Sequence, residues 1–591
     1  MDFWVVEFTR KQVMFPVFIK TTRAGGREYI KLVESYKEKG VTRHRVLFNF
    51  GRADLIKRDE SFLRIVKRLC EIAEIPLANS NESSAKTAVF DDCSEATLYN
   101  YGYLAYLKLW ETLGIRGCLE EVQSLTKISY SLPDIVFLMA VQHLLEPRSK
   151  LSTYENKHKY FNLPEISLHH MYRALDKLAD QKEYIETVLF QYNYIRLNKT
   201  VDVVFYDVTT ISFESVIADD LRNFGFSKEC KFNEVQVVMG MLIDSNGIPV
   251  GYELFPGNTF DGKTMVKALE NIKKRFGINR VIIVADRGIN SKQNLTLIKE
   301  AGYEYIVASK IRQMGAKMQE KILSPIGFIS LGDDLGAEQG FRYKTIEYEN
   351  VFTDSENVKH FLYENLVITY SPKRAKKDAS DRARLVEKAE KLLEDPEKIN
   401  ALNKRGGKKY INRTNPKKAE TWKLDADKIE KDAKFDGYYG IQSSAKNLSA
   451  LEVVDAYSML WKIEESFRIM KSTLEVQPVF HWNENRIKGH FVVCFLAFLM
   501  ERNMEQLLVS YSDDKISVSP LKIREALTSM QLAAVTSSGQ NFLIKTKSKP
   551  LSKKIFKNLQ IPIPANITPH DNILELYKDF YEHKPVQLSL L

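Results

Sequence analysis

The segment VDVVFYDVT, residues 201–209, is where the hydrophobic pattern of the chain changes from helical to strand-like. Three further apolar runs follow it: EVQVVMGMLID (234–244), IPVGYELF (248–255) and VIIVAD (281–286). Short, nearly continuous apolar runs rich in Val and Ile predict strands that are buried within a sheet. The tripeptide Ser245-Asn246-Gly247 between the second and third runs predicts a hairpin turn.

Helical patterns alternate with strands after this hairpin. One covers residues 262–277, another begins at about Ser291, and a last strand is expected at 303–309. The order β-β-β-α-β-α-β predicts an α/β layer built on a mixed sheet with flanking helices.

The segments before residue 201 indicate two further domains. Strand-like runs such as VFIKTT (17–22) and HRVLFNFG (44–51) predict a β-containing domain over residues 1–90. From 91 to 200 apolar residues recur at helical spacing, which predicts a helical domain. Small helical units of this kind often bind DNA, so we expect that role here.

The segments after residue 310 are more polar. Two strand-like runs, a charged helix and glycine-broken basic loops predict a β-rich basic insertion. A strong helix then resumes at Asn447, with Ser449 and Glu452 spaced as a capping box. The predicted domains of this multidomain α/β chain are residues 1–90, 91–200, 201–310, 311–445, 446–512 and 513–591, the last without an assigned role.

Charge and composition narrow the function classes. The 591 residues carry a net charge of +10. Between Ser371 and Gly440, 20 Lys and Arg residues face 13 Asp and Glu residues, which concentrates positive charge in the insertion. Such a surface suits a polyanion such as DNA, although a solvated helical face has the same composition.

Other sequence features argue against several kinds of site. The five cysteines are scattered singly, and the ten histidines form no HxxxH motif or Cys/His cluster, which argues against a disulfide framework or a zinc site. We expect His169, His170, His481 and His490 to be structural or to lie on the surface. The longest apolar run, Phe491 to Met500, is half of the roughly 20 residues that cross a bilayer, so we expect a cytoplasmic protein without a membrane partner.

Two aspartates close apolar runs of the predicted sheet. Asp207 ends the run VVFYD, and Asp286 ends VIIVAD. Carboxylates at the carboxyl ends of strands project into the crevice where α/β proteins usually build their sites. Either aspartate alone reads more simply as a turn former, but the pair in one sheet favours a site.

A third acidic residue lies in the predicted helix AYSMLWKIEESFRIMKSTLE, residues 456–475. Positions seven apart differ by about 20° around a helix, so Tyr457, Glu464 and Lys471 are expected to share one stripe, with Arg468 about 40° away. Such a stripe is either a functional face or an ordinary salt-bridge ladder.

Together these residues resemble the Asp-Asp-Glu triad of DDE transposases from bacterial insertion sequences. The resemblance is to the group with the signature Tyr-x2-Arg-x3-Glu-x6-Lys, which Tyr457, Glu464 and Lys471 match. The signature arginine is Leu460 here, so Arg468 or Lys462 is expected to contact phosphate instead. Glu465 is the neighbouring competitor for the glutamate role. The stretches YELFPGNTFDGKT, ADRGINSKQNL and GHFVVCFLAF also resemble this group, which extends the match over residues 140–500.

The resemblance implies an RNase H-like core interrupted by the insertion, and a phosphoryl-transfer site that binds two Mg²⁺ or Mn²⁺ ions. Asp207 would bridge the ions, and Asp286 and Glu464 would each hold one. Carboxylate oxygens suit these hard cations. The partner would be double-stranded DNA at element ends and target, bound by a dimer or larger assembly. Residues expected to contact DNA are Tyr457, Arg468, Lys471, Lys462, Arg287, Lys408 and Lys409.

The sequence leaves other functions open. An RNase H-like nuclease that cuts DNA without strand transfer would carry the same carboxylates. A domesticated, inactive DNA-binding protein is a second alternative, against which the intact acidic residues argue. A two-carboxylate glycosidase would leave the basic insertion without a purpose.

Overall fold

The computed structural model describes the chain in two compact units. The central unit is Asn198–Phe467, and the terminal unit joins Met1–Leu197 to Arg468–Leu591. The described residues are 17–38, 41–56, 64, 67–68, 97–161, 163–195, 203–225, 233–259, 264, 271, 274–276, 282–285, 290–330, 340–353, 357–394, 406–413, 422–477, 479, 481–510, 518–537 and 540–578.

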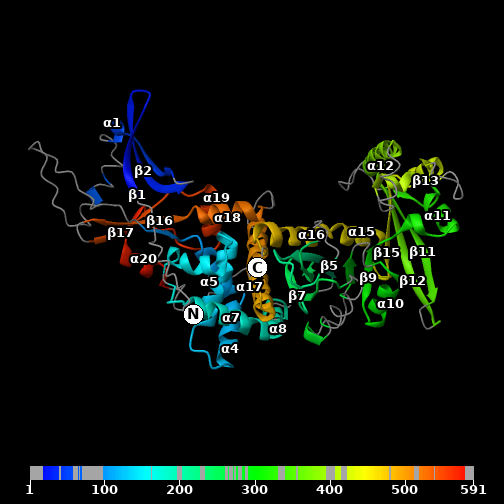
Figure 1. Ribbon diagram of the computed structural model, residues 1–591, viewed down its shortest axis with the longest axis horizontal. Helices are drawn as coiled ribbons and strands as arrows, with labels where there is room; N and C mark the ends of the chain where they lie inside the picture. Colours follow the sequence, from blue (N-terminus) through cyan, green and yellow to red (C-terminus); the bar gives the residue numbers. More distant parts are fainter. Residues whose placement is uncertain are drawn as a thin grey trace, which may run out of the picture. The chain divides into compact units, whose positions relative to one another are not determined.

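The central unit is built on one nine-stranded mixed sheet with the strand order β10-β11-β12-β15-β9-β8-β5-β6-β7 (Figure 1). The strands are β5 (Val203–Ser212), β6 (Gln236–Asp244), β7 (Pro249–Pro256), β8 (Ile282–Ala285), β9 (Glu304–Ala308), β10 (Ile329–Ser330), β11 (Arg342–Thr353), β12 (Lys359–Tyr370) and β15 (Tyr438–Ser443). The helices are α10 (Lys292–Glu300), α11 (Ala316–Leu323), α12 (Pro372–Leu393), α14 (Ala426–Ala433), α15 (Ala450–Ser458) and α16 (Trp461–Arg468), with 3₁₀ turns η4 (Ile311–Gln313) and η6 (Gly406–Tyr410) and a small pair β13 (Ile411–Arg413) and β14 (Trp422–Leu424).

The first five strands confirm the mixed sheet that the sequence predicts. β5, β6 and β7 pair antiparallel, whereas β5, β8 and β9 pair parallel. All nine residues of β6 are buried, which explains why its sequence is continuously apolar. The β6–β7 hairpin also forms as expected: the Asp244 carboxylate accepts the N–H groups of Asn246 and Ile248, and Gly247 adopts φ 82°.

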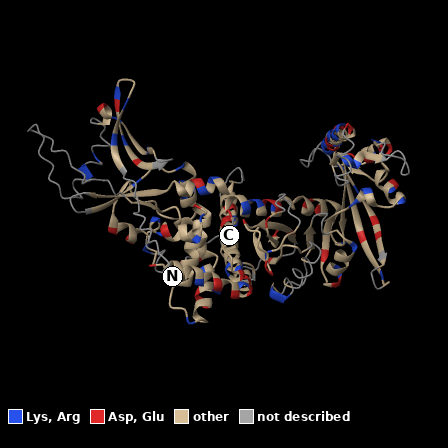
Figure 2. Ribbon diagram, viewed as in Figure 1, with Lys and Arg blue, Asp and Glu red and all other residues tan. Residues whose placement is uncertain are grey.

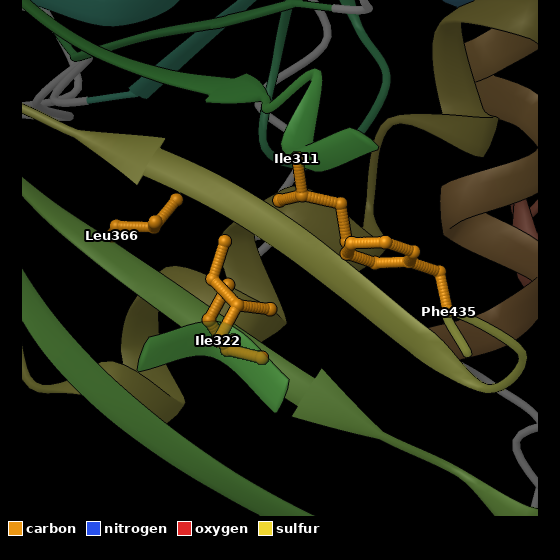
Figure 3. Packing of buried hydrophobic residues seen from close by; sticks show 5 residues of the cluster. Ile311, Ile322, Leu366 and Phe435 are labelled. Carbon is orange, nitrogen blue, oxygen red and sulfur yellow. The ribbon is translucent and has the colours of Figure 1, made fainter. Parts of the chain in front are cut away.

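The predicted insertion strands continue the same sheet. β11 and β12 form a long antiparallel hairpin, β12 pairs with β15, and β15 pairs with β9 (Figure 1). A hydrophobic cluster covers this part of the sheet; it contains Ile311, Ile322, Leu366, Ile368 and Phe435 (Figure 3). Gly440 of β15 permits the Ile311 side chain to approach the strand closely, because a Cβ at residue 440 would lie 2.3 Å from Ile311 Cγ2.

The helix predicted over 456–475 is not continuous. α15 ends at Ser458, α16 begins at Trp461, and the segment after Arg468 winds into a π-helical turn, η7 (Ile469–Thr473). The prediction that Tyr457, Glu464 and Lys471 share one stripe assumed an unbroken 3.6-residue period. Its geometry is therefore wrong. The capping box is confirmed: Ser449 Oγ accepts from the Glu452 N–H, and the Glu452 carboxylate accepts from the Ser449 N–H.

The terminal unit contains helices and two small sheets (Figure 1). Its helices are α1 (Ala53–Ile56), α3 (Leu104–Thr112), α4 (Ile115–Ser124), α5 (Leu132–Leu145), α6 (Lys150–Glu155), α7 (Leu168–Asp180), α8 (Lys182–Phe190), α17 (Glu484–Ser510), α18 (Pro520–Thr528), α19 (Pro550–Asn558) and α20 (His570–Leu576), with short turns η2 (Lys157–Lys159) and η3 (Gln191–Ile195). The strands are β1 (Val17–Ala24), β2 (Arg27–Glu38), β3 (Val41–Arg52), β4 (Leu98–Asn100), β16 (Gln531–Ser537), β17 (Gln540–Lys545) and β18 (Ile567–Pro569).

The C-terminal residues, for which the sequence suggested no role, complete a sheet with the start of the helical region. β16 pairs with β4, so that Gln531 lies opposite Asn100, and β17 and β18 extend the sheet. Among the described residues, no helix is both long enough and apolar enough to cross a bilayer.

Helix α17 packs closely on α7 because residue 489 is glycine. A Cβ at Gly489 would lie 2.0 Å from the backbone oxygen of Leu175, and backbone cannot yield as a flexible side chain can. We therefore expect Gly489→Ala to lower the free energy of unfolding by about 1–3 kcal/mol. Chemical denaturation measures the change. Gly117→Ala is the matched control because nothing lies within 4 Å of a Cβ there, and an equal loss in both variants would contradict the packing argument.

Candidate active site and nucleic-acid interface

Asp207 lies within β5 rather than at its end. The sequence-based expectation is wrong here, because β5 continues to Ser212 by pairing with β6 through Val208–Gly240 and Ser212–Gln236. The Asp207 side chain is half-buried, and its Oδ1 accepts a 2.7 Å hydrogen bond from the Val208 N–H. An ionised carboxylate offers about four lone-pair sites, and its oxygens are ligands of a kind that divalent cations bind.

The register between β5 and β8 bears on the second aspartate. Val203, Val204 and Phe205 pair in parallel with Ile282, Ile283 and Val284. Strand β8 ends at Ala285. Asp286 and Arg287, which the sequence assigns to the metal and DNA sites, lie outside the described residues.

Glu464 is exposed on the first turn of α16. Two residues earlier, Lys462 Nζ donates a 2.6 Å hydrogen bond to the backbone oxygen of Ser245 in the β6–β7 turn. Since β6 is the hydrogen-bonded neighbour of β5, this contact ties the glutamate helix to the strand pair that carries Asp207. Glu465, the competitor for the glutamate role, is less exposed than Glu464.

Tyr457 contacts the insertion side of the sheet. Its hydroxyl lies 2.8 Å from the hydroxyl of Tyr439 on β15, and the two ring centres are 5.7 Å apart. The Arg374 guanidinium of α12 lies over the ring of Tyr439, 4.2 Å from its centre. Leu460, which replaces the signature arginine, is buried with 7% exposure and therefore belongs to the core.

A basic cavity of about 460 Å³ adjoins these tyrosines. We call it the insertion cavity, and its basic lining residues are Lys310, Arg312, Arg374 and Lys409. Arg374 lies 3.7 Å from Asp378, and Lys409 forms an ion pair with Asp432. Lys408, the neighbouring residue of η6, is half-buried. Figure 2 shows Lys and Arg interspersed with Asp and Glu along α12, and the helix carries more basic than acidic residues.

A hydrogen-bond network joins strands β9, β12 and β15 to Asn290. Glu364 accepts hydrogen bonds from Tyr305 and from Gln442 Nε2, the latter at 2.8 Å. Asn290 Nδ2 donates to Gln442 Oε1 at 2.7 Å and to the Ala308 oxygen at 2.6 Å. Burial raises the pKa of Glu364.

Lys310 joins this network to the cavity, because its Nζ donates to the Asn290 oxygen at 2.9 Å. Sequence reasoning missed Asn290, Gln442 and Lys310. Asn290 stands four residues after Asp286 in the run ADRGIN, and that proximity was the signal available for it.

Arg468 and Lys471 belong to the terminal unit, unlike the other expected DNA contacts that the structure describes. Arg468 is exposed at the end of α16, and Lys471 is half-buried within η7.

The expectation that the chain contains no Cys/His cluster is wrong. His143, His490 and Cys494 are buried, and one ligand atom of each lies within 4.8 Å of the others. His490 and Cys494 are one helical turn apart on α17, a spacing that the sequence displayed. His143 comes from α5, and only folding brings it to the pair.

Comparisons with known proteins identify the family. The model of the transposase DDE domain matches residues 201–500, and the model of the IS1634 family transposase N-terminal domain matches residues 18–79. No curated protein is a significant match. Among solved structures, the Mos1 transposase paired-end complex with left transposon end matches at 14% identity and a TM-score of 0.14. That match covers 28% of this chain and 56% of the Mos1 chain, so this protein spans just over half of that neighbour's length. Because the DDE domain model covers half of the sequence, the chain belongs to the DDE transposases of bacterial insertion sequences.

Proposed function

We propose that this protein cuts DNA at the terminal inverted repeats of an insertion sequence and joins the 3′ ends to target DNA. The observation that carries the proposal is the β5–β8 register. Each pair of partners is 79 residues apart in the chain, as are Asp207 and Asp286. This equal separation supports the proposal that the two aspartates act as a pair. Residues in register on parallel neighbours point to the same face of a sheet.

The core topology supports the same function. The order β7-β6-β5-β8-β9, with three antiparallel strands followed by two parallel ones, is that of an RNase H-like core. In an RNase H-like core the catalytic carboxylates belong to the strands that correspond to β5 and β8, which supports the proposed roles of Asp207 and Asp286. The glutamate helix α16 is held to the β6–β7 turn through Lys462, and we propose that it supplies Glu464 to the same site.

The proposed ligand set fits a divalent metal ion. Asp207, Asp286 and Glu464 offer carboxylate oxygens, which hard cations such as Mg²⁺ and Mn²⁺ prefer. DDE transposases generally use divalent ions, and two such ions would neutralise charge on the reacting phosphate and on the entering and leaving oxygens. The residues of this chain would hold the ions and orient the DNA, and Glu464 is preferred over Glu465 because it is more exposed.

The insertion cavity is proposed to hold DNA backbone. Arg374 stacks on Tyr439, which contacts Tyr457, so a basic and aromatic surface continues from the start of the glutamate segment to the cavity. Arg and Lys suit phosphate oxygens because they donate charge-assisted hydrogen bonds. Lys408 and Lys409 extend this surface, while Lys462, Arg468, Lys471 and Arg287 remain proposed contacts with DNA phosphates.

Neutralising the cavity should weaken DNA binding in a salt-dependent manner. For the double variant Lys310→Gln, Arg374→Gln we expect the slope of log affinity against log salt to fall by about 2, since each phosphate contact contributes about 0.9. Binding is measured by fluorescence anisotropy with duplex DNA and without divalent ions. Lys391→Gln is the control, because Lys391 lies near the far end of α12 and pairs with Glu387. Equal slopes in all three proteins would exclude the cavity from the interface.

The decisive test of the function is product mapping. The purified protein is incubated with the DNA that flanks its own coding region and with Mg²⁺ or Mn²⁺, and the ends are sequenced. Cuts at inverted repeats together with joined 3′ ends support the proposal. Cuts without joined products would favour a nuclease, and specific binding without cuts would favour an inactive DNA-binding protein. We propose that the active form is at least a dimer, because two element ends have to be held together.

A further inference from the structure

A buried lysine lies at the centre of the Cys/His cluster of the terminal unit. Lys150 is 4% exposed, and its Nζ lies 3.0 Å from His143 Nε2 and 3.5 Å from His490 Nδ1. We call Lys150, His143 and His490, with the adjacent Cys494, the lysine–histidine cluster. The helices α5, α6 and α17 supply its members.

Two backbone carbonyls fix the protonation of both imidazoles. His143 Nδ1 lies 3.0 Å from the Leu474 oxygen, and His490 Nε2 lies 3.1 Å from the Val476 oxygen. A carbonyl only accepts, so these nitrogens carry the protons and the opposite nitrogens accept from Lys150. Glu475 lies between Leu474 and Val476 and has φ 47°. This left-handed backbone conformation directs the two neighbouring carbonyl oxygens toward the imidazoles.

The cluster therefore contains a cation without an anion of its own. Burial, followed by the charge of Lys150, lowers the pKa of both His143 and His490 well below the usual value, so both rings are neutral. Burial lowers the pKa of Lys150 to about 8, which leaves the amine mostly protonated at neutral pH. No ion pair joins Lys150 to a carboxylate within the described part of the chain.

A buried ammonium is costly unless a counter-charge and enough hydrogen-bond acceptors surround it. Lys150 has three N–H donors, and the two imidazoles supply two acceptors. One donor thus remains for a group that the cluster does not contain.

The cluster borders a cavity of about 320 Å³. Besides Lys150, its lining includes Arg148, Ser149, Gln477 and His481. Arg148 has a side chain that is 46% exposed and lies 3.5 Å from Glu146. The one carboxylate among the lining residues, Glu475, lies 3.9 Å from Arg524, which balances its charge. The cavity therefore offers two cations, the hydroxyls of Ser149 and Ser152 and an amide to a ligand.

We propose that this cavity is a phosphate-binding site, in which Lys150 and Arg148 hold the anion and Ser149 donates a further hydrogen bond. A tetrahedral oxyanion suits this set, because Lys and Arg bind it through charge-assisted hydrogen bonds. A metal ion fits less well, because the ammonium already occupies the lone pairs of both imidazoles. The phosphate group belongs either to a nucleic-acid strand or to a free anion.

The first experiment uses inorganic phosphate with the full-length protein, followed by calorimetry and by ³¹P line broadening. We expect the dissociation constant to rise at least about tenfold in Lys150→Met, as loss of a charge-assisted contact predicts. Arg148→Gln should also weaken binding; its half-exposed side chain makes this variant the safer one if Lys150→Met fails to fold. Lys127→Met is the control, because Lys127 is exposed in the same unit and the variant loses the same charge.

The second experiment separates the sources of the phosphate. Short oligonucleotides with a 5′-phosphate and with a 5′-hydroxyl compete against inorganic phosphate. Competition by both indicates an internal phosphodiester, competition by the first alone indicates a strand end, and competition by neither indicates a free anion. The proposal is overturned if the wild-type protein binds no phosphate, if Arg148→Gln binds it equally well, or if Zn²⁺ binds at the cluster in its place. Each readout is independent of DNA cleavage, so a failure here leaves the proposed transposition chemistry standing.

Discussion

The variant Asp207→Asn is expected to lose DNA cleavage by at least about a thousandfold while it keeps the fold and binds DNA as well as the wild type. The amide occupies the same volume but lacks the negative charge that a divalent cation requires, and metal-assisted phosphoryl transfer depends on that charge. Asp207 is half-buried and accepts a hydrogen bond from the Val208 N–H, which the Asn oxygen can also accept. Cleavage of end-labelled duplex DNA in Mg²⁺ measures the loss.

Matched variants test whether the loss of cleavage is specific to the proposed metal ligands. Glu214→Gln, two residues beyond the end of β5 and exposed, should cleave normally. Glu464→Gln should lose activity as Asp207→Asn does, whereas Glu465→Gln should retain most of it. Near-normal cleavage by Asp207→Asn would remove this residue from the metal site, and the opposite ranking of the two glutamate variants would transfer the role to Glu465.

The second large effect is expected on stability and comes from Glu501 of α17. This residue is 2% exposed, and Tyr106 donates a hydrogen bond to its carboxyl group. Burial raises the pKa of Glu501 from 4.5 to about 7. The folded protein therefore holds this proton more tightly than the unfolded chain does. Its contribution to stability is full below pH 4.5 and is lost as the pH rises toward 7.

A shift of this size corresponds to about 3 kcal/mol. We expect Glu501→Gln to abolish this dependence, so that the variant gains stability relative to the wild type as the pH rises from 5 to 8. Denaturant unfolding at a series of pH values measures it. The difference between the two curves isolates Glu501 from the buried histidines His143 and His490, whose lowered pKa values act in the opposite sense. A constant difference across this range would show that Glu501 titrates normally.

The central sheet could be predicted well from the sequence for a physical reason. Strands such as β6 are buried on both faces, so nearly every residue is apolar and the run is unmistakable. The Ser245-Asn246-Gly247 turn was equally readable, because few residues adopt the conformation that Gly247 has. Asp207 was found as the acidic residue that closes the apolar run VVFYD, but its place within β5 was not, because the strand continues through the more polar residues Thr209 and Thr210.

Features that depend on distant pairing could not be read from the sequence. The pairing of β12 with β15 places Leu366 opposite Gln442, which are far apart in the chain. One of these two partners is polar, so the apolar pattern did not reveal the pairing. The break between α15 and α16 has no proline or glycine to mark it. The lysine–histidine cluster unites Lys150 with His490, 340 residues apart. For the proposed site, the positions of Asp207 and Glu464 are described and that of Asp286 is not, and the participation of all three acidic residues stays a prediction.

The nine-stranded sheet has a practical consequence for anyone who wishes to trim this protein. β15 hydrogen-bonds to β9, and four of the five residues of β9 are buried. Excising residues 311–445 to obtain a minimal enzyme would remove β15 and leave β9 as an unpaired, apolar edge strand. Such an edge can pair with the edge of another molecule and cause aggregation. A shortened form that stays dispersed must retain β15 or cap that edge with charged residues or proline.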